Sequence, residues 1–251
     1  NTPLGATTGG MVIQKPGDTF ATHVLCGNTF FVNDGDGTFS ERSREAGLEN
    51  WWPWGLAIGD FNNDGHEDAF VTAGMGFPYA YWGNHLYLND GAGRFHERAR
   101  AAGVEPPRAG EVIAGLEIDG KPFTRSSRTV ACADLDLDGD LDLVVNNFNH
   151  EPYLLRNDSP ESNNWLQLDL RARGGRRPAF GARVEVLAGG RTWYRWLASA
   201  EGYLAQNSAV LHVGLGEARA IERVTVHWLG DAEPTVIDAP KIGQRLRVDQ
   251  P

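Results

Sequence analysis

Short runs in which apolar and polar residues alternate recur along the chain, and they are clearest after residue 164. Examples are WLQLDLRA (165–172), GARVEVLAG (181–189), AVLHVGLG (209–216) and IERVTVHWLG (221–230). A period of two residues is typical of half-buried strands, and the Gly-rich or polar segments between the runs are typical of turns. We therefore predict an all-β protein whose residues 163–251 form a β-sandwich-like domain.

The pattern in residues 24–160 is repetitive. Residues 28–49 align with residues 84–105 at an offset of 56, and twelve positions are identical. Both copies contain Asn-Asp-Gly between an aromatic-aliphatic run and a Phe, which predicts a hairpin turn. The segment 106–124 interrupts the second repeat and carries its own turn signal, Asp-Gly. We assign residues 24–160 to repeats of one kind of β unit.

A second repeated pattern is acidic. Residues 60–68 and 134–142 carry four and five carboxylates, and neither segment contains Lys or Arg. The formal net charge is −10, with 33 acidic against 23 basic residues, so these two segments hold almost all of the excess. Such concentration indicates cation sites in an otherwise nearly neutral protein. It also argues against a nucleic-acid binder, which would present a basic surface.

Oxygen-bearing side chains occupy equivalent positions in both acidic segments. With Asp60 and Asp134 as position 1, oxygen donors fall at positions 1, 3, 5 and 9, and Gly falls at position 6. In an EF-hand loop, ligands at 1, 3 and 5 with Gly at 6 allow the carbonyl of position 7 to join a calcium shell. We therefore predict two Ca²⁺ sites. Their expected ligands are Asp60, Asn62, Asp64, the backbone oxygen of His66 and Asp68 in the first site, and Asp134, Asp136, Asp138, the backbone oxygen of Asp140 and Asp142 in the second.

These loops differ from an EF-hand because they close with Asp at position 9 and then enter a strand. Oxygen donors without Cys or His favour Ca²⁺ over zinc or copper, and Mg²⁺ would demand a stricter octahedron. A solvated acidic hairpin is the alternative, and the repeated spacing favours calcium. The carboxylate of Asp140 is expected to be free, since position 7 contributes its backbone. Asn33–Gly37 is expected to be a turn and not a metal site, because the second copy has Ala92 in place of Asp36.

Other chemical signals are weak. The two cysteines, Cys26 and Cys132, form no CxxC pattern, so a disulfide and two buried thiols are both open. No apolar run reaches 18 residues, and we expect no membrane span. No HExxH, GxSxG, P-loop or GxGxxG sequence occurs, so we expect a protein without enzymatic activity. The chain starts at Asn1 without Met, as expected for a processed protein or a fragment.

At these motifs the chain resembles known families. The acidic loop paired with an N-DGDG-F hairpin is similar to FG-GAP/VCBS-type calcium-binding repeats, which usually build β-propeller blades. Gly202-Tyr203 and the LHVGLG run (211–216) are among the residues that resemble an ASPIC/UnbV C-terminal domain. The two together resemble the C-terminal part of a cartilage-acidic-protein-like secreted protein. The resemblance implies an extracellular, calcium-binding, non-catalytic protein whose metal ligands are the side chains named above.

Two full repeats and a partial one are too few to close a propeller. We therefore expect a partial β-propeller-like array followed by the C-terminal domain. Open sheet edges invite strand addition by another chain, so a homo-oligomer or polymer is expected. The N-terminal extension, residues 1–23, contains Met11-Val12-Ile13 and is expected to pair with a neighbouring sheet, with another copy as one candidate.

Two functional hypotheses follow. The first is a secreted structural or adhesive protein in which calcium stabilises the repeat hairpins and the chain self-assembles into an extracellular oligomer or filament. The alternative is an extracellular ligand-binding module for a glycan or a cell-surface protein, with Trp51 and Trp52 stacking on the ligand. Trp193 and Trp196 lie three positions apart in one predicted strand and are expected on opposite faces.

Overall fold

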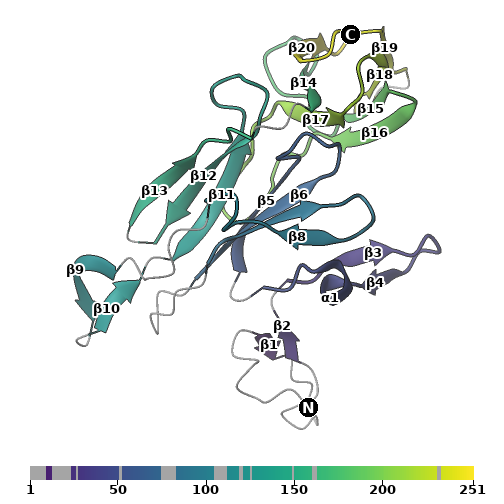
Figure 1. Cartoon of the computed structure of the whole chain (residues 1–251). Helices are drawn as coiled ribbons and strands as arrows, with labels where there is room; N and C mark the ends of the chain where they lie inside the picture. Colours follow the sequence, from purple (N-terminus) through teal and green to yellow (C-terminus); the bar gives the residue numbers. More distant parts are fainter. Residues whose placement is uncertain are drawn as a thin grey trace. The chain divides into compact units, whose positions relative to one another are not determined.

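The computed structural model is nearly all-β, as predicted (Figure 1). Trp51 and Trp52 lie outside the described residues, as does most of the N-terminal extension. Within the described residues there are twenty strands, β1 to β20, and one short helix, α1 (Ser43–Ala46). The structure describes residues 10–12, 24–26, 28–50, 53–74, 83–104, 112–118, 121–124, 126–148, 150–159, 163–230 and 233–251.

The chain divides into two compact units that interleave along the sequence. The first unit contains residues 1–56, 69–130 and 145–153, and the second contains residues 57–68, 131–144 and 154–251. Both acidic segments therefore group with the C-terminal residues and not with the hairpins of the repeats. Several strands begin in one unit and end in the other.

The strands before residue 156 form small sheets in which neighbours in sequence pair. β1 (Gly10–Val12) pairs antiparallel with β2 (Val24–Cys26), so the N-terminal segment has a partner within its own chain. Hairpins are formed by β3 (Phe31–Asn33) with β4 (Phe39–Glu41), and by β9 (Val112–Ile118) with β10 (Lys121–Thr124) in the predicted insertion. Larger sheets are formed in chain order by β5 (Pro53–Gly59), β6 (Asp68–Ala73), β7 (His85–Asn89) and β8 (Phe95–Glu97), and by β11 (Ser127–Ala133), β12 (Asp142–Asn147) and β13 (His150–Leu155).

The predicted repeat at an offset of 56 is visible in the backbone hydrogen bonds of the hairpins. Asp34 N donates to Thr38 O at 3.0 Å, and Asp90 N donates to Arg94 O at 2.9 Å. The chain that follows each hairpin also turns in the same way. Leu48 N donates to Ser43 O at 2.9 Å, and the equivalent Val104 N donates to Ala99 O at 2.9 Å. The Asn-Asp-Gly sequences are thus turns, as expected from their Gly content.

Two sheets make up the C-terminal part of the second unit. One has the order β17 (Leu211–Gly216), β14 (Asn164–Arg171) and β20 (Gln244–Asp249), and β14 runs parallel to β20. The other has the order β16 (Arg191–Trp196), β15 (Arg183–Ala188), β18 (Ile221–His227) and β19 (Thr235–Asp238). Both sheets are built from the alternating runs identified in the sequence.

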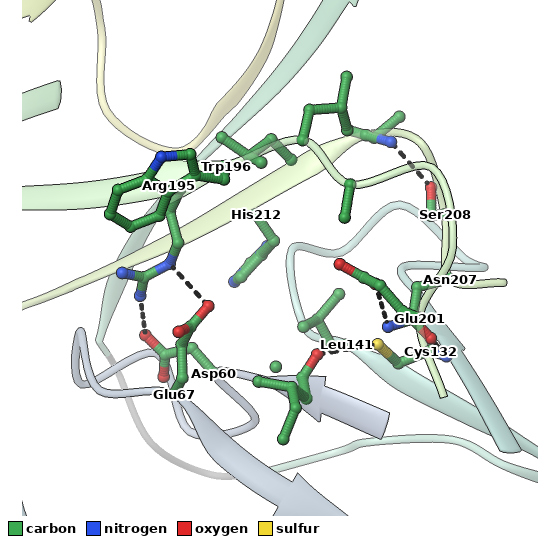
Figure 2. Close-up of a pocket in the computed structure, with 16 residues that line it drawn as sticks. Asp60, Glu67, Cys132, Leu141, Arg195, Trp196, Glu201, Asn207, Ser208 and His212 are labelled. Carbon is green, nitrogen blue, oxygen red and sulfur yellow. Dashed lines mark hydrogen bonds and ion pairs between the residues drawn. The ribbon is translucent and has the colours of Figure 1, made fainter. Parts of the chain in front are cut away.

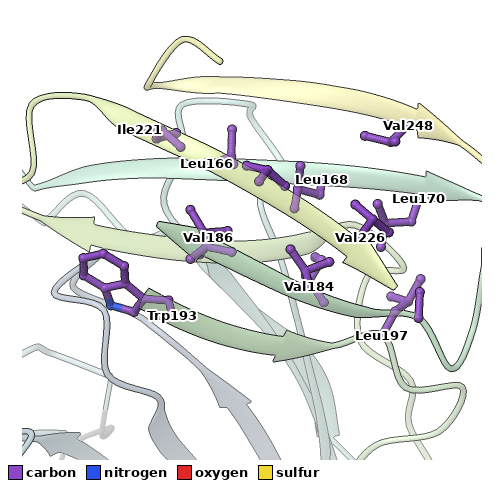
Figure 3. Close-up of a cluster of buried hydrophobic side chains, with 14 of the residues drawn as sticks. Leu166, Leu168, Leu170, Val184, Val186, Trp193, Leu197, Ile221, Val226 and Val248 are labelled. Carbon is purple, nitrogen blue, oxygen red and sulfur yellow. The ribbon is translucent and has the colours of Figure 1, made fainter. Parts of the chain in front are cut away.

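One apolar core is shared by these two sheets (Figure 3). Leu166, Leu168 and Leu170 alternate along β14 and are fully buried, because a period of two sends them all to one face. They belong to one buried cluster with side chains of β15, β16, β17, β18 and β20. Trp193 is 6% exposed and Trp196 is 61% exposed, so they lie on opposite faces as predicted. The β-sandwich-like character of residues 163–251 is confirmed.

Candidate metal centre

The two acidic segments form equivalent loops, one between β5 and β6 and the other between β11 and β12. In both, the carboxylate at position 1 accepts a hydrogen bond from the backbone of the Gly at position 6. Gly65 N lies 2.8 Å from Asp60 Oδ2, and Gly139 N lies 3.1 Å from Asp134 Oδ2. The carboxylate at position 9 accepts from the amide at position 2, at 2.9 Å and 2.8 Å. The chain therefore builds one loop geometry twice.

The backbone conformation explains why position 6 is Gly. Gly65 has φ +95° and Gly139 has φ +101°, a region that residues with a Cβ rarely adopt. Position 4 also takes a left-handed conformation in both loops, with φ 59° at Asn63 and 66° at Leu137. Gly at position 6 therefore allows the predicted turn in both copies.

One carboxylate oxygen in each loop has no hydrogen-bond partner. Oδ1 of Asp60 and Oδ1 of Asp134 are both buried and unpaired. An unsatisfied buried acceptor costs about 1–3 kcal/mol, more for a charged group, and a hard cation would satisfy it. In the second loop, one oxygen each from Asp134, Asp136 and Asp138 lie within 4.8 Å of one another. The residues present therefore fit a calcium ion.

Four other predicted ligand side chains are held by hydrogen bonds within or beside the loops. Asn62 Nδ2 donates to Asp64 Oδ2 at 2.9 Å, so the side chains at positions 3 and 5 of the first loop lie together. Asp68 and Asp142 are buried and each holds a loop amide with one oxygen. The second oxygen of Asp142 accepts from Asn157 N at 2.9 Å. A carboxylate oxygen keeps a further lone pair for a metal, so these bonds orient the ligand without blocking it.

Burial and the repulsion of neighbouring carboxylates raise the pKa values of three carboxyls in the two loops, Asp60, Asp136 and Asp140. Burial, followed by the charge of Asp64, raises the pKa of Asp60 to about 7, and Arg195 opposes the shift. Burial, followed by the charge of Asp138, raises the pKa of Asp140 to about 6. A carboxylate whose charged form is disfavoured in this way gains from a nearby cation.

Arg195 is a side-chain cation that reaches the first loop (Figure 2). It comes from β16 and is buried, with Nη2 at 3.9 Å from Asp60 Oδ2 and Nε at 3.6 Å from Glu67 Oε1. It also donates to Gly65 O at 3.1 Å. Arg195, Asp60, Glu67 and His212 line one pocket of the second unit. A single guanidinium among four carboxylates leaves the loop negative, so Arg195 does not replace a divalent ion.

Asn63 joins the two loops to each other and to β17. Its Nδ2 lies 2.7 Å from Asp140 Oδ1 and 3.3 Å from Gly139 O, and its Oδ1 lies 2.6 Å from His212 Nε2. The prediction that the Asp140 carboxylate is free is therefore wrong. The two loops approach closely enough for Asn63 to reach it, a contact between residues 77 positions apart that local spacing does not reveal.

The glycine turns of the loops pack on tryptophans of the C-terminal sheets. A Cβ added at Gly139 would overlap the Trp165 indole, and one added at Gly65 would overlap Trp193. Gln167 Nε2 donates to Asp134 Oδ2 at 2.6 Å, so β14 also holds a carboxylate of the second loop. Strands β14, β16 and β17 thus position both loops.

The residues that support the loops could not be recognised from the sequence, namely Arg195, His212, Gln167, Trp165 and Trp193. They lie far along the chain from their contacts, and no local motif marks them. The alternation pattern places Gln167 and His212 on the outward face of their sheet, opposite the buried leucines. It does not show that the acidic loops cover this face.

Cys132, at the end of β11, is a free and buried thiol. Burial raises its pKa to about 12, and its Sγ lies 3.6 Å from Ile58 O. The sequence left a disulfide and a buried thiol open, and Cys132 is a buried thiol. Because its pKa is raised, it is unreactive at neutral pH.

Comparisons with known proteins match both parts of the chain. Residues 172–251 match the family described as ASPIC and UnbV, and residues 18–71 match the family described as FG-GAP-like repeat. One curated relative is Cartilage acidic protein 1 of Mus musculus, 27% identical over 276 aligned residues that cover 89% of this chain and 41% of that protein. Another is Cartilage acidic protein 1 of Homo sapiens, 30% identical over 149 residues that cover 57% of this chain and 19% of that protein. The chain spans less than half the length of these relatives.

The two matches each include one of the sequence motifs described above. The FG-GAP-like match includes the first acidic loop, and the ASPIC and UnbV match includes the strands β15 to β20. Among the described residues, no helix has the length and apolar character needed to cross a membrane. The domain combination and the relatives point to an extracellular protein. We conclude that the chain combines an FG-GAP-like repeat with a C-terminal ASPIC and UnbV domain, as its sequence motifs predicted.

Proposed function

We propose that the protein is a secreted, non-enzymatic structural or adhesive protein that binds two Ca²⁺ ions, one in each acidic loop. The observation that carries this proposal is the pair of buried oxygens without partners, Asp60 Oδ1 and Asp134 Oδ1. They occupy the same position of two loops that share their hydrogen bonds. A solvated acidic hairpin gives no reason to bury the same oxygen twice.

The residues around the loops would turn ion binding into stability. A bound calcium ion supplies positive charge and coordination. Gly65 and Gly139 allow the turns, while Asn63 and Gln167 tie the loops to each other and to the C-terminal sheets. Because the unfolded chain has no preformed site, calcium would stabilise the folded second unit and attach the loops firmly to β14 and β17.

Isothermal titration calorimetry of the full chain with CaCl₂ tests this function. We expect two calcium ions per chain, and one per chain in Asp64→Ala and in Asp138→Ala. Asp158→Ala is the matched control, because Asp158 lies outside both loops and pairs with Arg156. The melting temperature is expected to fall in chelator. Absence of calcium binding, or an unchanged stoichiometry in both loop variants, would contradict the proposal.

Self-assembly through sheet edges is the second part of the proposal. Among the described strands, those at the ends of each sheet order, such as β13 and β16, have a neighbour on one side only. Such edges accept strands from another chain. β1 pairs with β2 within the chain, so only its second edge could take part in assembly. Light scattering in calcium is expected to show oligomers, and monomers at every concentration would remove this part of the proposal.

An exposed aromatic pair favours glycan binding as a second candidate function. Trp196 is 61% exposed and Tyr194 is 45% exposed, and their spacing of two places both on the outward face of β16. Arg183 and Glu185 stand opposite them in the register with β15. Aromatic faces beside polar groups suit a sugar ring, which offers both apolar and hydroxyl surfaces.

A glycan array distinguishes this second function. A signal that is lost in Trp196→Ala and kept in Leu229→Ala, a control on another exposed apolar residue, would support it. Trp51→Ala and Trp52→Ala belong in the same experiment, because the sequence singled out those positions. If the wild-type chain gives no signal on the array, glycan binding is contradicted and only the structural role remains.

A further inference from the structure

We propose that the C-terminal domain binds a sulfated polysaccharide through a cluster of arginines, here called the arginine patch. The patch lies along β20, at the carboxyl end of β14 and in the turn that follows β14. Its members are Arg171, Arg173, Arg176, Arg177, Arg245 and Arg247. Neither the calcium loops nor the exposed aromatic pair includes any of them.

Strand pairing and the turn bring these arginines together. β14 and β20 are parallel neighbours, and the register sets Asp169 beside Arg247 and Arg171 beside Asp249. The turn closes on itself through Ala172 N and Arg177 O at 2.8 Å. Arg247 Nη2 donates to Gly175 O at 3.2 Å, which joins the turn to β20. Two segments that are 70 residues apart in sequence therefore form one surface.

The carboxylates of the patch balance only part of its charge. Arg171 Nε lies 2.7 Å from Asp169 Oδ1, and Arg247 Nη2 lies 2.9 Å from Asp249 Oδ1. Arg176 and Arg177 are exposed, and neither has a carboxylate partner among the described residues. Six arginines against two aspartates leave a surplus of four positive charges in a chain whose net charge is −10. A local excess of this size attracts a polyanion.

The acidic loops do not cancel this field. They contact β14 through Trp165 and Gln167. Arg245 pairs with Gln167 in the register and so lies beside this contact. The exposed pair, Arg176 and Arg177, lies in the turn beyond Arg171, and the four residues of strand from Gln167 to Arg171 alone span about 13 Å. This exceeds the screening length of about 8 Å at physiological ionic strength, so the exposed pair acts as a separate positive surface.

The chemistry of the patch favours a sulfated glycan over other polyanions. Guanidinium groups bind the oxygens of sulfate through forked hydrogen bonds, and the exposed pair is free to do so. No large exposed apolar side chain lies in the described residues 171–178 or 241–249, so the patch lacks the groups that insert into a membrane. It also lacks exposed aromatic rings on which nucleic-acid bases would stack. An extracellular protein meets sulfated glycans in its own compartment.

Binding of the full chain to immobilised heparin, a sulfated polysaccharide, tests the proposal. We expect retention at about 0.15 M NaCl and weakening with salt, because binding releases counterions. Arg176→Gln/Arg177→Gln should elute at lower salt and lose about ten-fold or more in affinity. Arg219→Gln/Arg223→Gln removes the same charge from another exposed place in the domain and should elute like the wild type. Melting curves check that all variants are folded.

Competition experiments decide the class of ligand. Soluble heparin should displace the protein from the column, and desulfated heparin should not. Wild-type protein that flows through at 0.15 M NaCl, or control and patch variants that elute alike, would overturn the proposal. Tighter arginine-dependent binding to phosphatidylserine vesicles or to double-stranded DNA than to heparin would reassign the patch to that ligand. Retention is expected in chelator as well, so failure of the calcium sites would not affect this result.

Discussion

His212 lies at the junction of the first acidic loop and the C-terminal sheet, and its environment makes it neutral. Its Nε2 lies 2.6 Å from Asn63 Oδ1, its ring stacks at 6.4 Å on Trp165, and its Nδ1 is buried without a partner. Burial, with a smaller contribution from Arg195, lowers the pKa of His212 from 6.5 to about 3. The neutral ring carries its proton on Nε2, which donates to Asn63 Oδ1, and a second proton on Nδ1 would be buried without an acceptor.

Stability is expected to depend on this residue in mild acid. Above pH 6.5, His212 is neutral in both states and contributes no pH dependence. As the pH falls below 6.5, the unfolded chain binds a proton that the folded chain does not, so stability is lost by up to about 1.4 kcal/mol per pH unit. Between pH 6.5 and 4, His212→Gln should lose less stability than the wild type in denaturant titrations. His227→Gln is the control, and equal pH slopes for both variants would contradict the assignment.

At the scale of elements, the contact of the second loop with β14 is tested by the glycine at its turn. Gly139→Ala introduces strain at φ +101° and an overlap with Trp165. Gly174→Ala introduces similar strain at φ +89° with nothing within 4 Å, and should cost about 1–2 kcal/mol. Gly139→Ala should cost about 1–3 kcal/mol more, because the Trp165 indole must also be displaced. Chemical denaturation measures both, and equal losses would show that the loop does not pack on the strand.

The same elements show which features of the fold could be predicted from the sequence. Alternation predicted the leucine face of β14, and the repeated spacing of carboxylates predicted both loops. Both predictions succeeded because each strand or loop is defined by residues within about ten positions of one another. The carboxylate of Asp140 was assigned wrongly because its partner, Asn63, belongs to the other loop. The role of Arg195 was missed for the same reason, because nothing in an alternating strand indicates that its arginine contacts a loop far away in the sequence. Contacts between distant segments require the fold.

At the scale of the whole chain, the connectivity links the repeats to the C-terminal domain. The acidic loops belong covalently to the strands of the repeats, yet they group with residues 154–251 in the second unit. Gly216 N donates to Asn63 O at 2.8 Å, and Ser208 N donates to Cys132 O at 3.0 Å, so backbone hydrogen bonds attach both segments to the C-terminal domain. Calcium at the loops would therefore act on the C-terminal sheets more than on the hairpins.

Hydrogen exchange in calcium and in chelator measures this distribution. At a free calcium concentration 100 times the dissociation constant, each site adds about 2.7 kcal/mol to the folded state, which is about a 100-fold change in an opening equilibrium. Amides of the acidic loops and of β14 and β17 should exchange more slowly in calcium by up to this factor, because their opening releases the ion. Amides of the β3–β4 hairpin, which belongs to the first unit, should change little. Equal slowing of exchange in the hairpin, or no slowing in β14, would show that calcium does not act through the loop contacts with Asn63 and Gln167. The stability of the C-terminal domain would then not depend on calcium.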